Sequence, residues 1–303
     1  MGCGVKFTGF PPRIGLRAML LASADSANFQ LAVAAAIDMP SSCVPADAVL
    51  LSIVGGESVE LRPLQFDRVA SLRCLLRRVV SLCYNHTDAY GTCVRATQPA
   101  VVSREERYHA MTWMKWHLLR VALRTARTAF FVDADVLLLG NPFAHESVAR
   151  FATEQPRPAQ LLLHQFEGPG SNPLNGGQIC SSSWNEAEAI RTVLSDEPSS
   201  YDSATQRLDQ EIAYSALTRR GVPTAELPRA FAGNCWYGPE VVPWCQLVTF
   251  HAHCTGSLTE KITRMRLVLR ETEARCASAG RGSGSRVRGL LARRRMLESR
   301  PNA

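Results

Sequence analysis

Two aspartates, Asp133 and Asp135, interrupt an apolar run in the segment AFFVDADVLLLGNPF, residues 129–143. An unpaired carboxylate buried in such a run would cost several kcal/mol. Residues i and i+2 of a strand point to the same face, so the two side chains project together if one strand continues through them. Open α/β sheets bind ligands at the carboxyl ends of their strands. Two carboxylates converging there favour Mg²⁺ or Mn²⁺, although solvation or pairing with arginine would also accommodate them.

The first half of the chain alternates predicted strands and helices, which favours an α/β fold with a mainly parallel central sheet flanked by helices. Strands are predicted at 17–22, 48–54 and 78–83, and helices at 28–38 and 67–76. A polar stretch, 85–107, leads into the amphipathic helix 109–125, whose methionines 111 and 114 recur at helical spacing. The strand with the aspartates follows.

The second half continues the same alternation. Strands are predicted at 161–166, 177–183 and 246–251, and helices at 186–194, 209–217 and 259–277. The loop EGPGSNPLN, residues 167–175, is rich in Gly, Pro and Asn and separates the first two of these strands. We therefore divide the chain into an N-terminal extension, 1–16, one α/β domain, 17–277, and a basic, flexible C-terminal tail, 278–303.

The formal net charge of +7 belongs to the end of the chain. Residues 275–303 contain eight arginines and one acidic residue, Glu298, so residues 1–274 are formally neutral. The domain therefore lacks the basic surface of a nucleic-acid-binding protein. The most apolar long segment, around 18–37, contains too many polar residues to span a membrane, and no signal peptide is recognised.

The chain contains ten cysteines but no C-x-x-C pair, which argues against a zinc ribbon or a thioredoxin-type motif. Their even number and wide spacing allow disulfides in a secretory lumen, and reduced core cysteines are an equal alternative. One glycosylation sequon, Asn85-His86-Thr87, is consistent with the lumen.

A predicted helix with Lys115, followed by an apolar strand ending in Asp133-Ala134-Asp135, resembles the D-x-D region of retaining nucleotide-sugar glycosyltransferases with the GT-A fold. The similarity is to the glycogenin-like group, glycosyltransferase family 8, and more closely to family 77, which includes plant xylosyl- and arabinosyltransferases. Three later stretches match in order. Leu174-Asn175-Gly176-Gly177 resembles the F-N-S-G turn of these enzymes, and Leu208-Asp209-Gln210 resembles their D-Q pair.

The third stretch, Thr249 to Cys254 with Gly256 and Lys261 beyond it, resembles the late H-x-N…G…K motif of these families. Together the matches span about residues 17–265. Two positions depart from the pattern, because Gly176 replaces a serine and His253 replaces an asparagine. The second departure leaves open which imidazole would face a metal, and we favour His251, with His253 as the alternative.

The resemblance implies a nucleoside-diphosphate-sugar donor and a role for each matching residue. Asp133, Asp135 and a histidine would hold Mn²⁺ or Mg²⁺, and Lys115 and Lys261 would add positive charge beside the diphosphate. The segment Asn175-Gly176-Gly177 would approach the donor sugar, and Asp209 or Gln210 would lie near its anomeric carbon. Without the resemblance, both lysines would be interpreted as solvated helix positions and Asp209 as a helix cap.

In this fold the nucleotide base lies at the end of the first strand, so we expect Ser23 and Asp25 there and the backbone of Ala134 at the ribose. We expect the acceptor, a glycan or glycoprotein, to contact the loops 85–107 and 221–245. The second loop contains three aromatic residues that either stack on a sugar or belong to the core: Trp236, Tyr237 and Trp244.

The predicted function is that of a metal-dependent retaining hexosyl- or pentosyltransferase with a UDP-linked donor. The family works mostly in the Golgi lumen behind an N-terminal anchor. No anchor is visible, so either the start is truncated or the enzyme is soluble, with the cytoplasm as the alternative location. Two other functions remain: an inactive GT-A nucleotide-sugar-binding protein, and a haloacid-dehalogenase-type phosphatase. The phosphatase needs a later acidic pair for Mg²⁺, which the isolated aspartates 196, 202 and 209 do not supply.

Overall fold

A computed structural model describes residues 23–84, 87–96, 104–153, 162–166, 174–182, 184–197, 209–233 and 244–276. Several predictions fall outside these residues: the strand at 17–22, the segments 1–16 and 278–303, the first two sequon residues, and Trp236 with Tyr237. Within the described residues, none of the helices combines the length and the apolar composition that crossing a bilayer requires.

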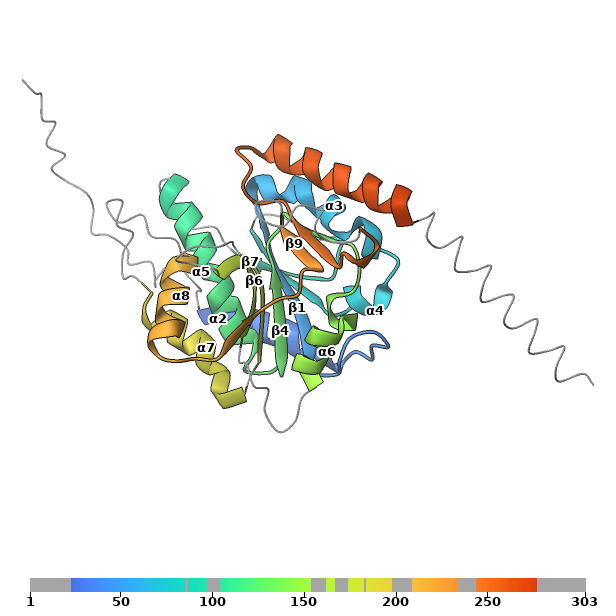
Figure 1. The fold of residues 1–303 in the computed structure, drawn as a ribbon. Coiled ribbons are helices and arrows are strands. Elements are labelled where there is room, and N and C mark those ends of the chain that lie inside the picture. Colours follow the sequence, from blue (N-terminus) through green and yellow to red (C-terminus); the bar gives the residue numbers. More distant parts are fainter. Residues whose placement is uncertain are drawn as a thin grey trace, which may run out of the picture.

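A seven-stranded sheet forms the centre of the molecule, in the order β3-β2-β1-β4-β7-β6-β8 (Figure 1). Its strands are β1 (Ala48–Gly55), β2 (Val79–Tyr84), β3 (Thr92–Ala96), β4 (Thr128–Val132), β6 (Leu162–Phe166), β7 (Leu174–Ser182) and β8 (Thr224–Glu226). Neighbouring strands are parallel except at β7, which runs antiparallel to both β4 and β6. The prediction of a mainly parallel sheet is therefore confirmed.

Four helices cover one face of this sheet: α2 (Ser23–Asp38), α5 (Arg104–Ala122), α7 (Trp184–Ser195) and α8 (Asp209–Arg219) (Figure 1). Strand β1 is buried along its whole length, as expected for a parallel strand that is covered on both sides. Val49 and Leu51 point towards these helices, whereas Ala48 and Leu50 point towards the opposite layer.

The opposite layer contains short helices and a second sheet of three strands. The helical elements are η1 (Gly56–Leu61), α3 (Arg62–Phe66), η2 (Asp67–Val69), α4 (Arg73–Leu76), η3 (Pro142–Ala144), α6 (Glu146–Thr153) and η4 (Trp244–Gln246). The second sheet has the order β5-β10-β9, with β5 (Val136–Leu138), β10 (Thr249–His251) and β9 (Phe231–Gly233). The final helix, residues 258–276, packs against this sheet through a third apolar cluster that includes Phe250 and Met265.

Several predicted boundaries were wrong. The apolar run around the aspartates is not one strand, because the chain leaves the large sheet after β4 and joins the small sheet at β5. Strand β7 begins at Leu174, so the segment predicted as a turn lies within a strand, and α2 begins at Ser23 rather than at residue 28. The predicted helix 67–76 is a series of short helical turns. The elements that were not predicted include the strands β3, β8 and β9 and the helices α3 and α6.

Disulfides join Cys43 to Cys74, Cys83 to Cys93, and Cys245 to Cys276. Cys254 is disulfide-bonded as well, whereas Cys180 is buried and free. Of the two cysteine states left open by the sequence, the described residues therefore adopt mainly the oxidised one.

Phe130 joins the two sheets and supplies a test of this packing. Its ring is fully buried and lies 5.9 Å from the ring of Phe231 in β9. We expect Phe130→Ala to lower the free energy of unfolding by about 3–5 kcal/mol, because the cavity cannot close between two sheets. The control Leu31→Ala, on a side chain that is 69% exposed, should change it by no more than about 0.5 kcal/mol. Chemical denaturation measures both, and equal effects would contradict this role of Phe130.

Candidate active site

A cleft of about 480 Å³ opens where β1 and β4 end and β7 begins. Because β7 runs antiparallel to β4, its amino end lies at the same sheet edge as the carboxyl ends of the parallel strands β1 and β4. The lining residues come from β1 and η1, α5, the D-x-D segment, β7, α8 and the stretch from β10 to the final helix. Most site residues predicted from the sequence therefore lie around one cavity, although their roles stay predictions.

The segment Asp133-Ala134-Asp135 is a tight turn between two sheets. The Asp133 amide donates to the carbonyl oxygen of Gly177 at 2.8 Å, and the Asp133 carbonyl accepts from the Val136 amide at 3.1 Å. The same carbonyl also accepts from the side-chain nitrogen of Gln65 at 2.8 Å. The two carboxylates thus converge through a turn and not through strand alternation, which corrects the geometry expected from the sequence.

His251, at the end of β10, faces the second aspartate. Its Nε2 lies 3.2 Å from Oδ1 of Asp135, and its Nδ1 lies 2.9 Å from Oε1 of Gln165. Because an amide oxygen only accepts, Nδ1 carries the proton, and in the neutral ring Nε2 turns a lone pair towards the carboxylate. A cation or a second proton is needed between those two acceptors.

Asp133, Asp135 and His251 form a cluster whose candidate ligand atoms all lie within 4.8 Å of one another. Two carboxylates and one imidazole, with a second hydrogen bond fixing the ring, are a donor set that fits Mn²⁺ or Mg²⁺. The alternative ligand, His253, does not belong to this cluster. It stacks on His251 with ring centroids 4.4 Å apart. Burial and the nearby His251 lower the pKa of His253 to about 3, so its ring is neutral.

A buried chain of amides supports His251 from behind. Oε1 of Gln165 also accepts from Nε2 of Gln178 at 2.9 Å, and Oε1 of Gln178 accepts from the Thr249 hydroxyl at 2.5 Å. All three side chains are buried. A polar network with this many satisfied partners fixes the ring orientation and the tautomer of His251.

Two glycines make room for the imidazoles. A Cβ on Gly177 would lie 2.1 Å from Cε1 of His251, and a Cβ on Gly233 would lie 2.3 Å from Cε1 of His253. Real Cβ atoms do not approach so closely, so any larger residue displaces the rings. The β7 glycines predicted to approach the donor sugar therefore also contact the protein's own side chains, because a Cβ on Gly176 would lie 2.5 Å from Nζ of Lys115.

The charges of the cleft are unevenly balanced. Burial raises the pKa of Asp133, and the neighbouring Asp135 carboxylate raises it further, against the opposing effect of Lys115. Burial acts in the same direction on Asp135, but His251 and Lys261 outweigh it and hold the pKa of that carboxyl well below its usual range. Nζ of Lys261 lies 2.5 Å from Oδ2 of Asp135. Lys261, which was predicted to lie beside the diphosphate, therefore contacts one of the aspartates, and its role towards the diphosphate stays a prediction.

Lys115 and Asp209 form a second charged group opposite the D-x-D turn. Their side chains are 5% and 3% exposed and lie 3.2 Å apart, so Lys115 is not the solvated helix position of the simpler interpretation. Oδ2 of Asp209 also accepts from Nε1 of Trp116 at 2.9 Å, and Lys115 donates to the Gly176 carbonyl at 3.2 Å. Gln210 is half-buried, and its Oε1 accepts from the Gly176 amide at 3.3 Å.

Three further predictions have mixed outcomes. Ala134 lines the cleft, and the contact of its backbone with the ribose stays a prediction. Ser23 and Asp25 lie in the first turn of helix α2, and their side chains lie outside the described part of the structure, as does the strand predicted before them. Trp244 packs against the third apolar cluster, with the guanidinium of Arg275 over its ring at 5.1 Å, which favours the core interpretation of this tryptophan.

Sequence reasoning missed the three glutamines 65, 165 and 178. Gln165 and Gln178 interrupt the apolar runs LLLHQF and GQIC in the way that the aspartates interrupt theirs. That signal could have identified them, because a buried amide in a strand requires a specific partner.

The mainly parallel sheet flanked by helices and the aspartate turn beside a cleft agree with the expected GT-A fold. Compared with known protein families, residues 64–265 match the nucleotide-diphospho-sugar transferases. This match covers more than half of the chain, and the chain belongs to the nucleotide-diphospho-sugar transferase family. The phosphatase alternative is thereby excluded, and the protein is a glycosyltransferase.

Two solved structures are similar in overall fold. One is a glycosyltransferase involved in glycosylation of the major capsid of PBCV-1, with 16% identity, a TM-score of 0.49, and coverage of 73% of this chain and 98% of that chain. The other is mouse xyloside xylosyltransferase 1 in its apo form, with 10% identity, a TM-score of 0.43, and coverage of 69% and 98%. No curated protein matches the sequence.

Gly177 provides a test of the metal centre. We expect Gly177→Ala to lower the affinity for Mn²⁺ at least about tenfold, because the new methyl group displaces the ring of His251. The control is Gly140→Ala, where no atom lies within 4 Å of the added Cβ. Isothermal titration calorimetry measures both affinities. Unchanged binding in the Gly177 variant would exclude His251 as a ligand in this position.

Proposed function

We propose that this glycosyltransferase is metal-dependent and retaining and takes its sugar from a UDP-linked donor. The observation that carries the proposal is the cluster of Asp133, Asp135 and His251 beside Lys115 and Lys261 in one cleft. The resemblance to families 8 and 77 supports retention and the uridine nucleotide.

The charge of the cleft favours a metal together with a diphosphate. Among the described residues that line it, three aspartates face two lysines, which leaves one negative charge when the histidines are neutral. A divalent ion reverses that sign and makes the cleft attractive to a diphosphate. When bound, the ion would act as a Lewis acid on the diphosphate oxygens as the sugar leaves. Asp133, Asp135 and His251 would hold it, and Lys261 would stabilise the phosphates directly.

We place the nucleotide base at the end of β1. The reasoning that selected Ser23 and Asp25 applies to the first strand of the sheet, and the first strand described is β1. Ile53, Ser58 and Leu61 line the cleft there, and the Ser58 hydroxyl is held by the amide and carbonyl of Gly55 at 3.0 and 2.7 Å. The backbone of Ala134 would contact the ribose.

The two candidate residues for sugar transfer differ in their surroundings. Asp209 is 2% exposed and bonded to Trp116 and Lys115, an arrangement suited to holding the lysine towards the phosphates. Gln210 is less enclosed and lines the same cleft. We therefore propose that Gln210 lies near the anomeric carbon and that Asp209 positions Lys115.

We also propose a glycan or glycoprotein acceptor and a location in the Golgi lumen, with the cytoplasm as the alternative. The disulfides Cys43–Cys74, Cys83–Cys93 and Cys245–Cys276 support an oxidising compartment, because reducing cytosol keeps most thiols free.

Nucleotide and metal dependence can be tested by thermal unfolding. We expect UDP, but not GDP or ADP, to raise the Tm of the wild type only when Mn²⁺ is present, and Asp135→Asn to abolish that shift. A ligand at 100 times its dissociation constant contributes about 2.7 kcal/mol, which is readily measured. The control Asp67→Asn changes an exposed carboxylate outside the cleft and should keep the full shift.

A UDP shift that survives in Asp135→Asn, or one that needs no metal, would contradict the donor site. Binding without turnover is a separate outcome. If UDP and Mn²⁺ bind but no UDP-sugar is hydrolysed or transferred, the protein is an inactive nucleotide-sugar-binding member of the family.

The stereochemical part of the proposal has its own test. We expect the free sugar released by hydrolysis of an α-linked UDP-sugar to have the α configuration when first formed. NMR of its anomeric proton resolves this configuration before mutarotation. A product that starts as the β anomer would establish inversion and remove the proposed role of Gln210.

A further inference from the structure

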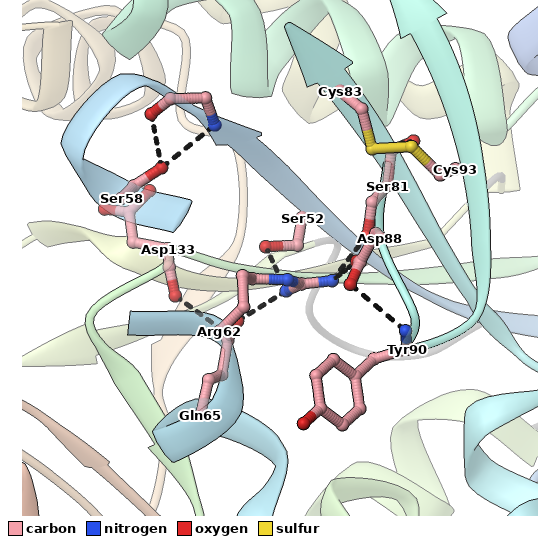
Figure 2. Close-up of polar contacts among 11 residues, drawn as sticks. Ser52, Ser58, Arg62, Gln65, Ser81, Cys83, Asp88, Tyr90, Cys93 and Asp133 are labelled. Atoms are coloured by element: carbon pink, nitrogen blue, oxygen red, sulfur yellow. Dashed lines mark hydrogen bonds and ion pairs between the residues drawn. A yellow bond between two sulfur atoms is a disulfide. The ribbon is translucent and has the colours of Figure 1, made fainter. Parts of the chain in front are cut away.

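Arg62, the first residue of α3, is buried beneath the sheet edge next to the D-x-D turn (Figure 2). Its guanidinium donates to the hydroxyls of Ser52 at 3.3 Å and Ser81 at 2.8 Å, and it forms an ion pair with Asp88. It also lies over the ring of Phe66, 4.5 Å from the centroid. Burying an arginine costs several kcal/mol unless it is paired and hydrogen-bonded, and here it is both.

Gln65 links this buried arginine to the active site. Nη1 of Arg62 donates to Oε1 of Gln65 at 2.5 Å, and Nε2 of Gln65 donates to the carbonyl oxygen of Asp133 at 2.8 Å (Figure 2). Arginine can only donate, so the amide oxygen of Gln65 must face it. The amide nitrogen must then face the Asp133 carbonyl. The orientation of the glutamine, and with it the bond to the turn, is therefore determined by Arg62.

The other end of the network is fixed by the connection between β2 and β3. Oδ1 of Asp88 accepts from the Tyr90 amide at 3.1 Å, and the Tyr90 ring stacks on Phe66 with centroids 5.2 Å apart. The disulfide between Cys83 and Cys93 joins the two strands on either side of this connection (Figure 2). Asp88 is thus held where it neutralises Arg62.

We infer that Gln65 is a positioning residue for the metal-binding turn and that Arg62 and Asp88 fix its orientation. The turn is tied at its amide to Gly177 and at its carbonyl to Val136 and Gln65. Among the described residues, Gln65 supplies the one side-chain hydrogen bond to that carbonyl. This inference rests on the proposed function in one respect, namely that Asp133 and Asp135 bind a divalent ion.

The test compares three variants of the full chain at pH 8. Gln65→Glu keeps an acceptor for Arg62 but replaces the donor to the Asp133 carbonyl with an oxygen. Gln65→Met removes both the acceptor and the donor from a side chain of similar length. It replaces the first variant in the test if that variant does not fold. The control, Ser81→Ala, removes a hydrogen bond of comparable length from the same arginine without touching the turn.

The first readout needs no metal. Hydrogen exchange measured by mass spectrometry on a peptide covering residues 130–138 reports the Asp133 amide, which is bonded to Gly177, and the Val136 amide, which is bonded to the Asp133 carbonyl. We expect faster exchange in both Gln65 variants and wild-type exchange there in Ser81→Ala. Equal acceleration in all three variants would show a general loss of stability and overturn the inference, as would unchanged exchange in the Gln65 variants.

The second readout is the affinity for Mn²⁺ with UDP, measured by calorimetry. We expect the Gln65 variants to bind about 10- to 100-fold more weakly and Ser81→Ala to bind within about twofold of the wild type. Faster exchange with unchanged affinity would overturn the positioning role. If the wild type itself binds no metal, the proposed function fails, and only the exchange result then decides whether Gln65 holds the turn.

Discussion

Two carboxylates lie side by side in the turn that connects the large sheet to the small one, and contacts from several distant segments hold them there. Asp133 and Asp135 repel each other, and burial strengthens the repulsion. The fold answers with cations from distant segments, Lys115 from α5 and Lys261 from the final helix. It also fixes the connecting turn by its backbone, so that the side chains have little freedom to separate. Because the three aspartates of the cleft outnumber its two lysines, the site retains a negative charge that favours a cation.

Strand β7 contributes to the site through its direction. A parallel strand would bring its carboxyl end to the cleft, whereas the reversed β7 brings its first residues there, with Leu174 and Asn175 paired to β6 and the residues from Gln178 onward paired to β4. The backbone of Gly176 is held by the side chains of Gln210 and Lys115. The backbone of Gly177 is held by the side chain of Asn175 and the amide of Asp133. The absence of side chains on these residues lets Lys115 and His251 approach from opposite sides. Rigid backbone and close packing therefore occur together at the centre of the site.

Much of the fold could be predicted because strands such as β1 and β2 are continuous apolar runs, and α5 follows a helical repeat. The division of the aspartate segment between two sheets could not be predicted, because β4 and β5 are equally apolar and differ only in the distant strands with which they pair. The short strands β8 and β9 have three residues each, too few for a periodic signal. Gln65 lies in a segment without a clear period, and its role depends on Arg62 and Asp88, which only the tertiary structure brings together.

The position of Lys261 has a consequence for how the enzyme acquires its site during synthesis. It is separated from its partner Asp135 by 126 residues, and His251 is nearly as remote. Because chains emerge from the ribosome amino end first, the large sheet can begin to form while both aspartates still lack these partners. Contacts over such separations form slowly. The last stretch, β10 and the final helix, therefore completes the cleft, and a chain truncated before residue 250 would keep most of the large sheet but lack His251 and Lys261 in the cleft.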